Sequence, residues 1–163
     1  MPYHIYTTRG IVLGSHPSRE ADRLYAILTE DLGLVRARAG GVRLEKSKLR
    51  GMLEPFSLVR VSLVRGKGEW RITSAELVRA LAHGPELARP FSLLEKLVAG
   101  EEPHPELFRA IEALLESGDP GAETQMVARI LYHLGYLREE DLGLAPRELV
   151  LAINRSLRET HLL

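Results

Sequence analysis

The sequence predicts an α+β protein in which an N-terminal five-stranded β-barrel is followed by a small α-helical bundle. In the first half, short segments alternate between apolar and polar residues with a period of two, which is typical of half-buried strands. In the second half, apolar residues recur at three- and four-residue steps, which is typical of amphipathic helices. The period changes near residues 80–85. We therefore predict two domains, residues 1–79 and residues 80–163.

Five segments carry the strand pattern: TTRGIVL (7–13), ADRLYAILT (21–29), LVRARAG (34–40), FSLVRVSLVR (56–65) and EWRITSAELV (69–78). In the third segment Val35 and Ala37 face one way, whereas Arg36 and Arg38 face the other. The glycines of residues 65–68 interrupt the alternation between the last two segments and predict a hairpin loop there.

A break at residues 46–54 separates the third strand from the fourth, and KSKLRGMLE is expected to form a short helix in this interval. Five strands with a short helix between the third and the fourth is the arrangement of an OB-fold, a small and partly open barrel. The first domain is therefore predicted to be an OB-fold.

Four segments carry the helical pattern: ARPFSLLEKLVAG (88–100), HPELFRAIEALLESG (104–118), AETQMVARILYHLGYL (122–137) and APRELVLAINRSLRET (145–160). In the second of these, one stripe is shared by Leu107, Ile111, Leu114 and Leu115. Proline and glycine occur at every junction. These features predict a bundle of short helices.

The amino-acid composition excludes several classes of function. The chain has 163 residues, of which 45% are hydrophobic and 27% charged, so a packed fold is expected. Cysteine is absent, which excludes disulfides, thiolate zinc sites and cysteine catalysis. No apolar run approaches the roughly 20 residues of a membrane span, and MPYHIYTTRG lacks the layout of a secretory signal. A cytoplasmic protein is expected.

The zero net charge conceals an asymmetry between the two halves. Residues 1–79 hold 14 Lys+Arg and 8 Asp+Glu, a net charge of +6, whereas residues 80–163 hold 8 and 14, a net charge of −6. Such a division indicates either different partners or two faces that attract each other. The basic half favours a polyanionic ligand.

The segment GGVRLEKSKLRG (40–51) superficially matches the phosphate-binding pattern G-x-x-x-x-G-K-[ST]. Glu45 occupies the position of the last glycine and would bring a negative charge to the phosphate. The strand before the segment alternates as a half-exposed strand, whereas a phosphate loop follows a buried parallel strand. An ATP- or GTP-using enzyme built on Lys46 and Ser47 is retained only as a hypothesis, to be tested by nucleotide calorimetry.

The same segment is better interpreted as part of a nucleic-acid surface. Strand, loop and helix start all contribute cations, and further cations lie elsewhere in the basic half. The predicted DNA-binding residues are Arg9, Arg36, Arg38, Arg43, Lys46, Lys48, Arg50, Arg65 and Lys67. Single strands also need stacking surfaces, and Tyr25 is predicted to stack on a base, while Phe56 and Trp70 are expected in the core or hairpin.

No enzyme signature accompanies these cations. The six histidines show no H-E-x-x-H and no ligand spacing, so neither a metal nor a cofactor is predicted. His133 lies beside the apolar stripe of its helix and is expected at the core boundary. No Ser-His-Asp arrangement follows from the spacing, and no catalytic residue is assigned.

The order of several short motifs resembles a known family. TRGIVL (8–13), SREADRL (18–24), LTEDLGLV (28–35) and GGVRLEKSKLRGMLEPF (40–56), followed by the GKG hairpin and SAEL (74–77), are similar to the N-terminal domain of the bacterial recombination mediator RecO. The similarity covers about residues 7–79, and its specificity comes from the order of the pieces.

This resemblance implies a DNA-repair protein without catalytic turnover, acting at the nucleoid. RecO-like proteins bind single- and double-stranded DNA and anneal complementary strands. With a RecR-like mediator they help to load a recombinase. They also bind the acidic tail of single-stranded DNA-binding protein. An acidic helical half is a poor binding site for such a tail unless it contains a local basic or apolar groove. By position, the family's basic barrel surface maps onto residues 36–50.

Two departures accompany the resemblance. Family members usually run longer, and many carry a cysteine-ligated zinc module in the helical part, which a chain without cysteine does not provide. An alternative from a different class is a protein-interaction adaptor whose basic barrel face meets an acidic partner, with DNA binding incidental. Partners that survive nuclease treatment in a pull-down would favour the adaptor.

Overall fold

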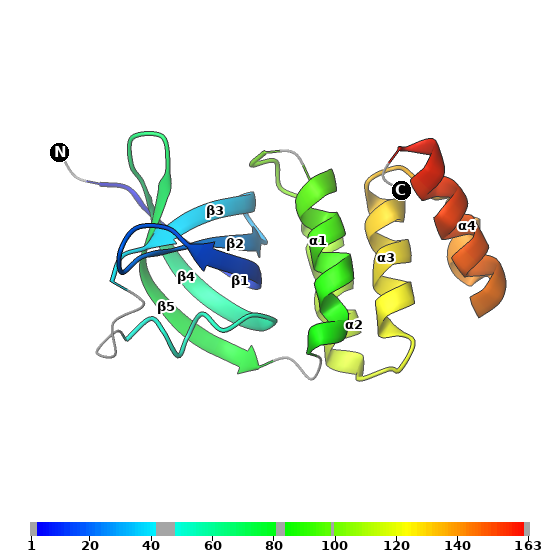
Figure 1. Ribbon diagram of the computed structural model, residues 1–163, viewed down its shortest axis with the longest axis horizontal. Coiled ribbons are helices and arrows are strands. Elements are labelled where there is room, and N and C mark those ends of the chain that lie inside the picture. The colour runs from blue at the N-terminus through cyan, green and yellow to red at the C-terminus, as the bar shows by residue number, and fades with distance from the viewer. Residues whose placement is uncertain (1–2, 42–47, 81–83, 99, 162–163) are drawn as a thin grey trace.

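The computed structural model describes residues 3–41, 48–80, 84–98 and 100–161, and it places a β-barrel beside a layered set of helices (Figure 1). The N-terminal strands form the barrel, and the chain then passes into the helices without returning. The change of period near residues 80–85 therefore marks the change from strand to helix. The α+β class predicted from the sequence is confirmed.

Five strands close the barrel in the order β1-β2-β3-β5-β4, which is the OB-fold arrangement predicted above. All neighbouring pairs are antiparallel except β3 and β5, which pair in parallel over a short stretch only. The strands are β1 (Ile5–Pro17), β2 (Arg23–Thr29), β3 (Gly33–Ala39), β4 (Ser57–Arg65) and β5 (Trp70–Ala80).

Strand β1 pairs with both β2 and β4 and has to bend to do so. Its register with β2 shifts between Val12 and Gly14, so Leu13 forms a bulge that turns the strand. Gly10 lies where a Cβ atom would meet Cγ2 of Ile27 at 2.5 Å. The close approach of the two strands therefore requires a residue without a side chain at this point.

The barrel interior is filled by the inward residues of every strand, including Val35, Ala37 and Trp70. Leu53 joins this cluster from the connection between β3 and β4 and is 1% exposed. The short helix expected at residues 46–54 is wrong for the described part, because residues 48–53 form turns. Gly51 and Pro55 disfavour continued helix, and a single buried leucine closes this end of the barrel instead.

Four α-helices and two short 3₁₀ helices follow the barrel: η1 (Pro85–Leu87), α1 (Ala88–Leu97), α2 (Pro105–Ser117), α3 (Ala122–His133), η2 (Glu139–Gly143) and α4 (Pro146–Glu159). Helices α1 and α2 lie next to the barrel, and α4 is the most distant from it (Figure 1). Of the predicted stripe on α2, Leu107, Ile111 and Leu115 are buried. Leu114 is only partly buried and packs at the edge of the core.

One hydrophobic core is shared by the barrel and the helices. Ile11, Leu28 and Leu34 point outward from their strands and pack with Phe91 and Phe108 from α1 and α2. Strand β2 is therefore buried on both faces over residues 25–29, which explains why its sequence alternates weakly. A separate cluster joins α3 to α4. In the described residues, no helix has the length and apolar character needed to cross a membrane.

Candidate nucleic-acid interface

A groove of about 890 Å³ runs along the outer face of the barrel beside the β4–β5 hairpin. Its position follows from strand register: Arg38 of β3 pairs with Arg71 of β5, and Arg71 pairs with Val64 of β4. Paired residues point to the same face of a sheet, so these side chains form a row across neighbouring strands. The basic groove, as we call it, is lined by Tyr3, Ile5, Arg38, Val64, Arg65, Gly66, Lys67, Glu69, Arg71 and Thr73.

The four cations of the basic groove differ in how they are held. Arg38 is 12% exposed and lies between Glu69, at 2.7 Å, and Asp22, at 3.8 Å. Lys67 and Arg71 are exposed, and in the described part of the chain neither takes part in an ion pair. The groove thus combines one fixed cation with two that are available to an anionic ligand.

Arg65 is held by the loop that precedes α2. It pairs with the carboxylate of Glu101 and lies over the Trp70 ring at 5.0 Å from the ring centroid. Trp70 donates its Nε1 hydrogen to Oε1 of Glu101 over 2.8 Å. Burial alone would raise the pKa of Glu101, but the hydrogen bonds from Trp70 and Arg65 outweigh it and hold that pKa below its ordinary value. Glu101 is therefore an anion at neutral pH, and its ion pair with Arg65 neutralises part of the guanidinium charge.

Three residues that the sequence predicts as DNA-binding, Arg38, Arg65 and Lys67, lie together in this groove. Arg71 was not predicted, although the alternation of EWRITSA places it outward, next to Trp70, which faces inward and is 5% exposed. What the sequence does not show is the parallel pairing of β3 with β5, which brings Arg71 beside Arg38.

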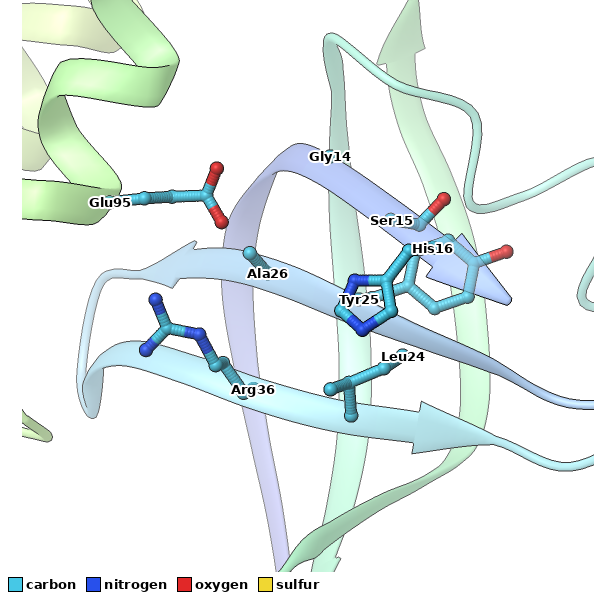
Figure 2. A pocket seen from close by; sticks show the side chains of 8 residues that line it. All are labelled: Gly14, Ser15, His16, Leu24, Tyr25, Ala26, Arg36 and Glu95. Atoms are coloured by element: carbon cyan, nitrogen blue, oxygen red, sulfur yellow. The ribbon is translucent and has the colours of Figure 1, made fainter. Parts of the chain in front are cut away.

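Arg36 is exposed but lies elsewhere, in a cleft of about 210 Å³ between the barrel and α1. Figure 2 shows Arg36 from β3 and Glu95 from α1 on the same side of Ala26, at the helical end of this cleft. The carboxylate places an opposite charge in the same small space. This cleft is less suited to a phosphate backbone than the basic groove.

The remaining cations of the predicted segment fall into two sets. Lys48 and Arg50 are exposed on the connection that leads to β4, outside the residues that line the basic groove. Arg43 and Lys46, like the Ser47 of the phosphate-loop hypothesis, lie outside the described residues.

Arg9 has a different environment from the one its sequence position indicates. Its Nε donates to Glu30 over 2.9 Å, its NH1 donates to Glu112 of α2 over 3.0 Å, and its guanidinium lies 5.5 Å from the Phe108 ring centroid. Burial disfavours the charge, but the bonds to Glu112 and Glu30 outweigh it and raise the pKa of Arg9 above its ordinary value. The geometry does not support Arg9 as a DNA contact, because both carboxylates already neutralise it.

Tyr25 is likewise placed away from solvent. Its side chain belongs to the barrel core and is 4% exposed, and burial raises the pKa of its hydroxyl. A base stacks on an exposed ring face, which Tyr25 does not offer, so the structure argues against the stacking role predicted for it. The sequence ADRLYAILT does not distinguish the inward face of this strand from the outward face, because both faces carry apolar residues.

The described residues contain no group of three or more His, Asp or Glu side chains arranged to hold a metal ion. His133 is half-buried beside His104 and Glu106, at the core boundary expected for it. Burial lowers the pKa of His133 below its ordinary value. These observations leave the basic groove as the feature best suited to bind a ligand.

Comparison with known proteins agrees with the barrel and its helices. Two family models match: Recombination protein O N terminal over residues 1–81, and Recombination protein O C terminal over residues 91–148. The chain belongs to the RecO family. The first match spans the whole barrel, and the second runs from α1 to the start of α4.

Curated relatives carry the name DNA repair protein RecO. The protein from Trichodesmium erythraeum (strain IMS101) is 32% identical over 160 residues, which is 88% of this chain and 54% of the relative. That from Synechococcus sp. (strain JA-2-3B'a(2-13)) is 34% identical over 160 residues, or 87% and 55%. That from Dehalococcoides mccartyi (strain ATCC BAA-2266 / KCTC 15142 / 195) is 42% identical over 77 residues, or 47% and 30%.

The chain thus spans about half the length of the curated RecO proteins that it matches over both parts. The family and its relatives are named for recombination and DNA repair. The names say nothing of individual residues.

Proposed function

We propose that this chain is a DNA-binding recombination mediator in DNA repair, and that it binds single- and double-stranded DNA through the basic groove. The observation that carries the proposal is the convergence of Arg38, Arg65, Lys67 and Arg71 on one groove of the barrel. Each strand of DNA presents a row of phosphates, and a row of cations releases counterions when it binds them. Membership of the RecO family supports the same reading.

The proposal predicts binding that depends strongly on salt. If all four cations of the groove meet phosphates of a single strand, so that Arg38 and Arg65 exchange their carboxylate partners for phosphate, log K should fall with log salt with a slope near −3. Trp70 is the only tryptophan of the chain, and its buried ring lies under the guanidinium of Arg65, which lines the groove. A ligand that moves Arg65 should therefore change the intrinsic fluorescence of Trp70, and anisotropy of labelled oligonucleotides gives an independent measurement.

The decisive variant is Lys67→Glu combined with Arg71→Glu, since both side chains are exposed and free of ion pairs within the described residues. It should weaken binding to all sequences alike and make the salt slope for a single strand shallower by about 1.4, which is two phosphate contacts. A matched control is Arg109→Glu combined with Arg155→Glu, which changes the net charge equally at exposed positions on α2 and α4. Equal losses in the two variants would refute a local site.

A second pair tests the predicted loop surface. Lys48→Glu combined with Arg50→Glu changes two exposed cations outside the groove. If these residues, together with Arg43 and Lys46, extend the interface as the sequence predicts, this variant should also lower affinity and slope. If the groove alone binds DNA, it should behave like the control on α2 and α4.

The acidic helical half holds one groove that could receive the acidic tail of single-stranded DNA-binding protein. This groove, of about 600 Å³, lies among α1, α3 and α4, and Leu93, Val127 and Ile153 line it. Arg89 and Lys96 also line this groove and outnumber its one acidic residue, Glu123, so the lining has the local positive charge that an acidic and apolar peptide requires. We propose it as the docking site, and Lys96→Glu should weaken the binding of such a peptide in an anisotropy titration.

Strand annealing, and recombinase loading together with a RecR-like mediator, complete the proposal as activities to be assayed. Annealing of complementary labelled strands should fall in the Lys67/Arg71 variant in step with its loss of DNA affinity. If instead partners are captured from nuclease-treated lysate while oligonucleotide binding is undetectable, the adaptor hypothesis replaces this one.

A further inference from the structure

The basic groove has an apolar wall as well as its cations. Tyr3 and Ile5, which are 77% and 59% exposed, line it together with Val64. Ile5 pairs in register with Val64, and Val64 with Arg71, so the wall continues the row of cations across β1, β4 and β5. Among the large apolar side chains described here, Tyr3 is the most exposed.

The segment that carries Tyr3 is fixed by its alternate residues. Tyr6 packs edge-on against Trp70, with ring centroids 5.4 Å apart, and His4 packs edge-on against Tyr6 at 4.3 Å. His4 and Tyr6 thus lie on the Trp70 side of the chain, whereas Tyr3 and Ile5 line the groove on the other side. Tyr3 therefore offers an exposed aromatic ring to a planar ligand in the groove.

We infer that Tyr3 stacks on a nucleobase, with Ile5 and Val64 beneath the neighbouring nucleotide, so that the basic groove prefers single-stranded DNA. This inference rests on the proposed function and adds what the cations alone do not supply. Phosphates are common to single strands and duplexes, whereas only unpaired bases are free to leave their stack and lie on a ring. The wall, therefore, and not the charge, distinguishes the two forms.

The test compares Tyr3→Ala and Tyr3→Phe with the wild type on three ligands of equal length: a single strand, a duplex and an abasic single strand. Tyr3→Ala should lose at least about fivefold in affinity for the single strand, the low end of one stacked base. Tyr3→Phe keeps the ring and should retain most of the affinity. Binding to the duplex and the abasic strand should change less than about twofold, with an unaltered salt slope.

The abasic strand has the same phosphates and no bases, so it isolates the stacking contribution. The wild type should lose affinity on going from the normal to the abasic strand, and Tyr3→Ala should lose much less. Equal losses of Tyr3→Ala on all three ligands, or none on the single strand, would overturn the inference. If DNA affinity is unchanged but self-association falls in sedimentation, the wall is a protein interface and the inference fails.

The same titrations separate this inference from the proposal beneath it. Absence of salt-sensitive binding by the wild type to any of the three ligands overturns the proposed function and the stacking inference with it. Salt-sensitive binding that Lys67→Glu and Arg71→Glu weaken, but that Tyr3→Ala leaves unchanged, overturns the stacking inference alone.

Discussion

Replacing Arg9 by alanine should destabilise the fold and leave DNA binding almost unchanged. Arg9 joins β1 to Glu112 on α2, and the Glu112 side chain is 18% exposed. Removing the guanidinium leaves this carboxylate next to the shared core without a cation. Hydrogen bonds to charged groups contribute about 1.5–3 kcal/mol, and the partial exposure of Arg9 favours the lower end.

We therefore expect Arg9→Ala to lower the free energy of unfolding by about 2 kcal/mol. For a chain of this size that corresponds to a fall in Tm of about 4–8 °C. Urea unfolding and calorimetry measure both quantities. Arg60→Ala is the matched control, because the Arg60 and Glu76 side chains are 50% and 72% exposed, and their pair at 3.5 Å should contribute less than about 1 kcal/mol.

The double variant Arg9→Ala/Glu112→Ala separates the pair from its surroundings. It removes the carboxylate along with its partner, so it should cost less than the sum of the single changes, with a coupling of about 1 kcal/mol or more. A loss for Arg9→Ala no greater than for Arg60→Ala would refute the reasoning. So would a clear drop in DNA affinity and salt slope at unchanged stability, which would return Arg9 to the DNA surface.

Three further outcomes follow from particular contacts. Gly33→Ala should lower Tm by several degrees, because Gly33 has a φ of +75° and a new Cβ there would clash with the carbonyl oxygen of Glu102. Gly14→Ala is the control and should be nearly neutral, because the space around Gly14 is open. Glu101→Gln should raise DNA affinity by up to about fivefold in anisotropy titrations, because the carboxylate no longer competes with phosphate, and unchanged or weaker binding would contradict this. Burial lowers the pKa of His133 in the folded state, so the contribution of the neutral imidazole to stability is present above the unfolded pKa of about 6.5 and is lost as the pH falls below that value. His133→Gln should therefore flatten this part of the pH-stability profile. An unchanged profile would argue against a contribution of His133 to the pH dependence of stability.

The sequence predicts the fold well because its signals are local. The alternation of LVRARAG and the helical stripes specify which residues are buried, and the order of five strands leaves few closed arrangements. The prediction of a short helix at residues 46–54 is wrong for the described part of this interval, because a buried Leu53 closes the barrel without a helix. That compensation depends on a tertiary contact and has no signature in the local pattern.

The candidate site was only partly predictable for a related reason. A run of cations along the chain indicates a basic half, but the pairing of β3 with β5 decides which of them meet. The sequence predicts Arg9 as a DNA contact and Tyr25 as a stacking residue. In the structure, Arg9 is neutralised by Glu112, which lies 103 positions further along the chain, and Tyr25 faces the barrel core. Contacts between distant segments carry this information, and strand alternation alone does not contain it.

The shared core of barrel and helices has a consequence for how the two surfaces act together. Because Ile11 and Leu28 belong to the same buried cluster as Phe91 and Phe108, any movement of the barrel against α1 and α2 would expose apolar surface to water, so this shared core favours one fixed arrangement. A nucleic acid on the β4–β5 side and a peptide on the α1–α3–α4 side would be held at a constant separation and angle. Communication between them would then be geometric: one ligand sets where the other is delivered, and no change of shape is required.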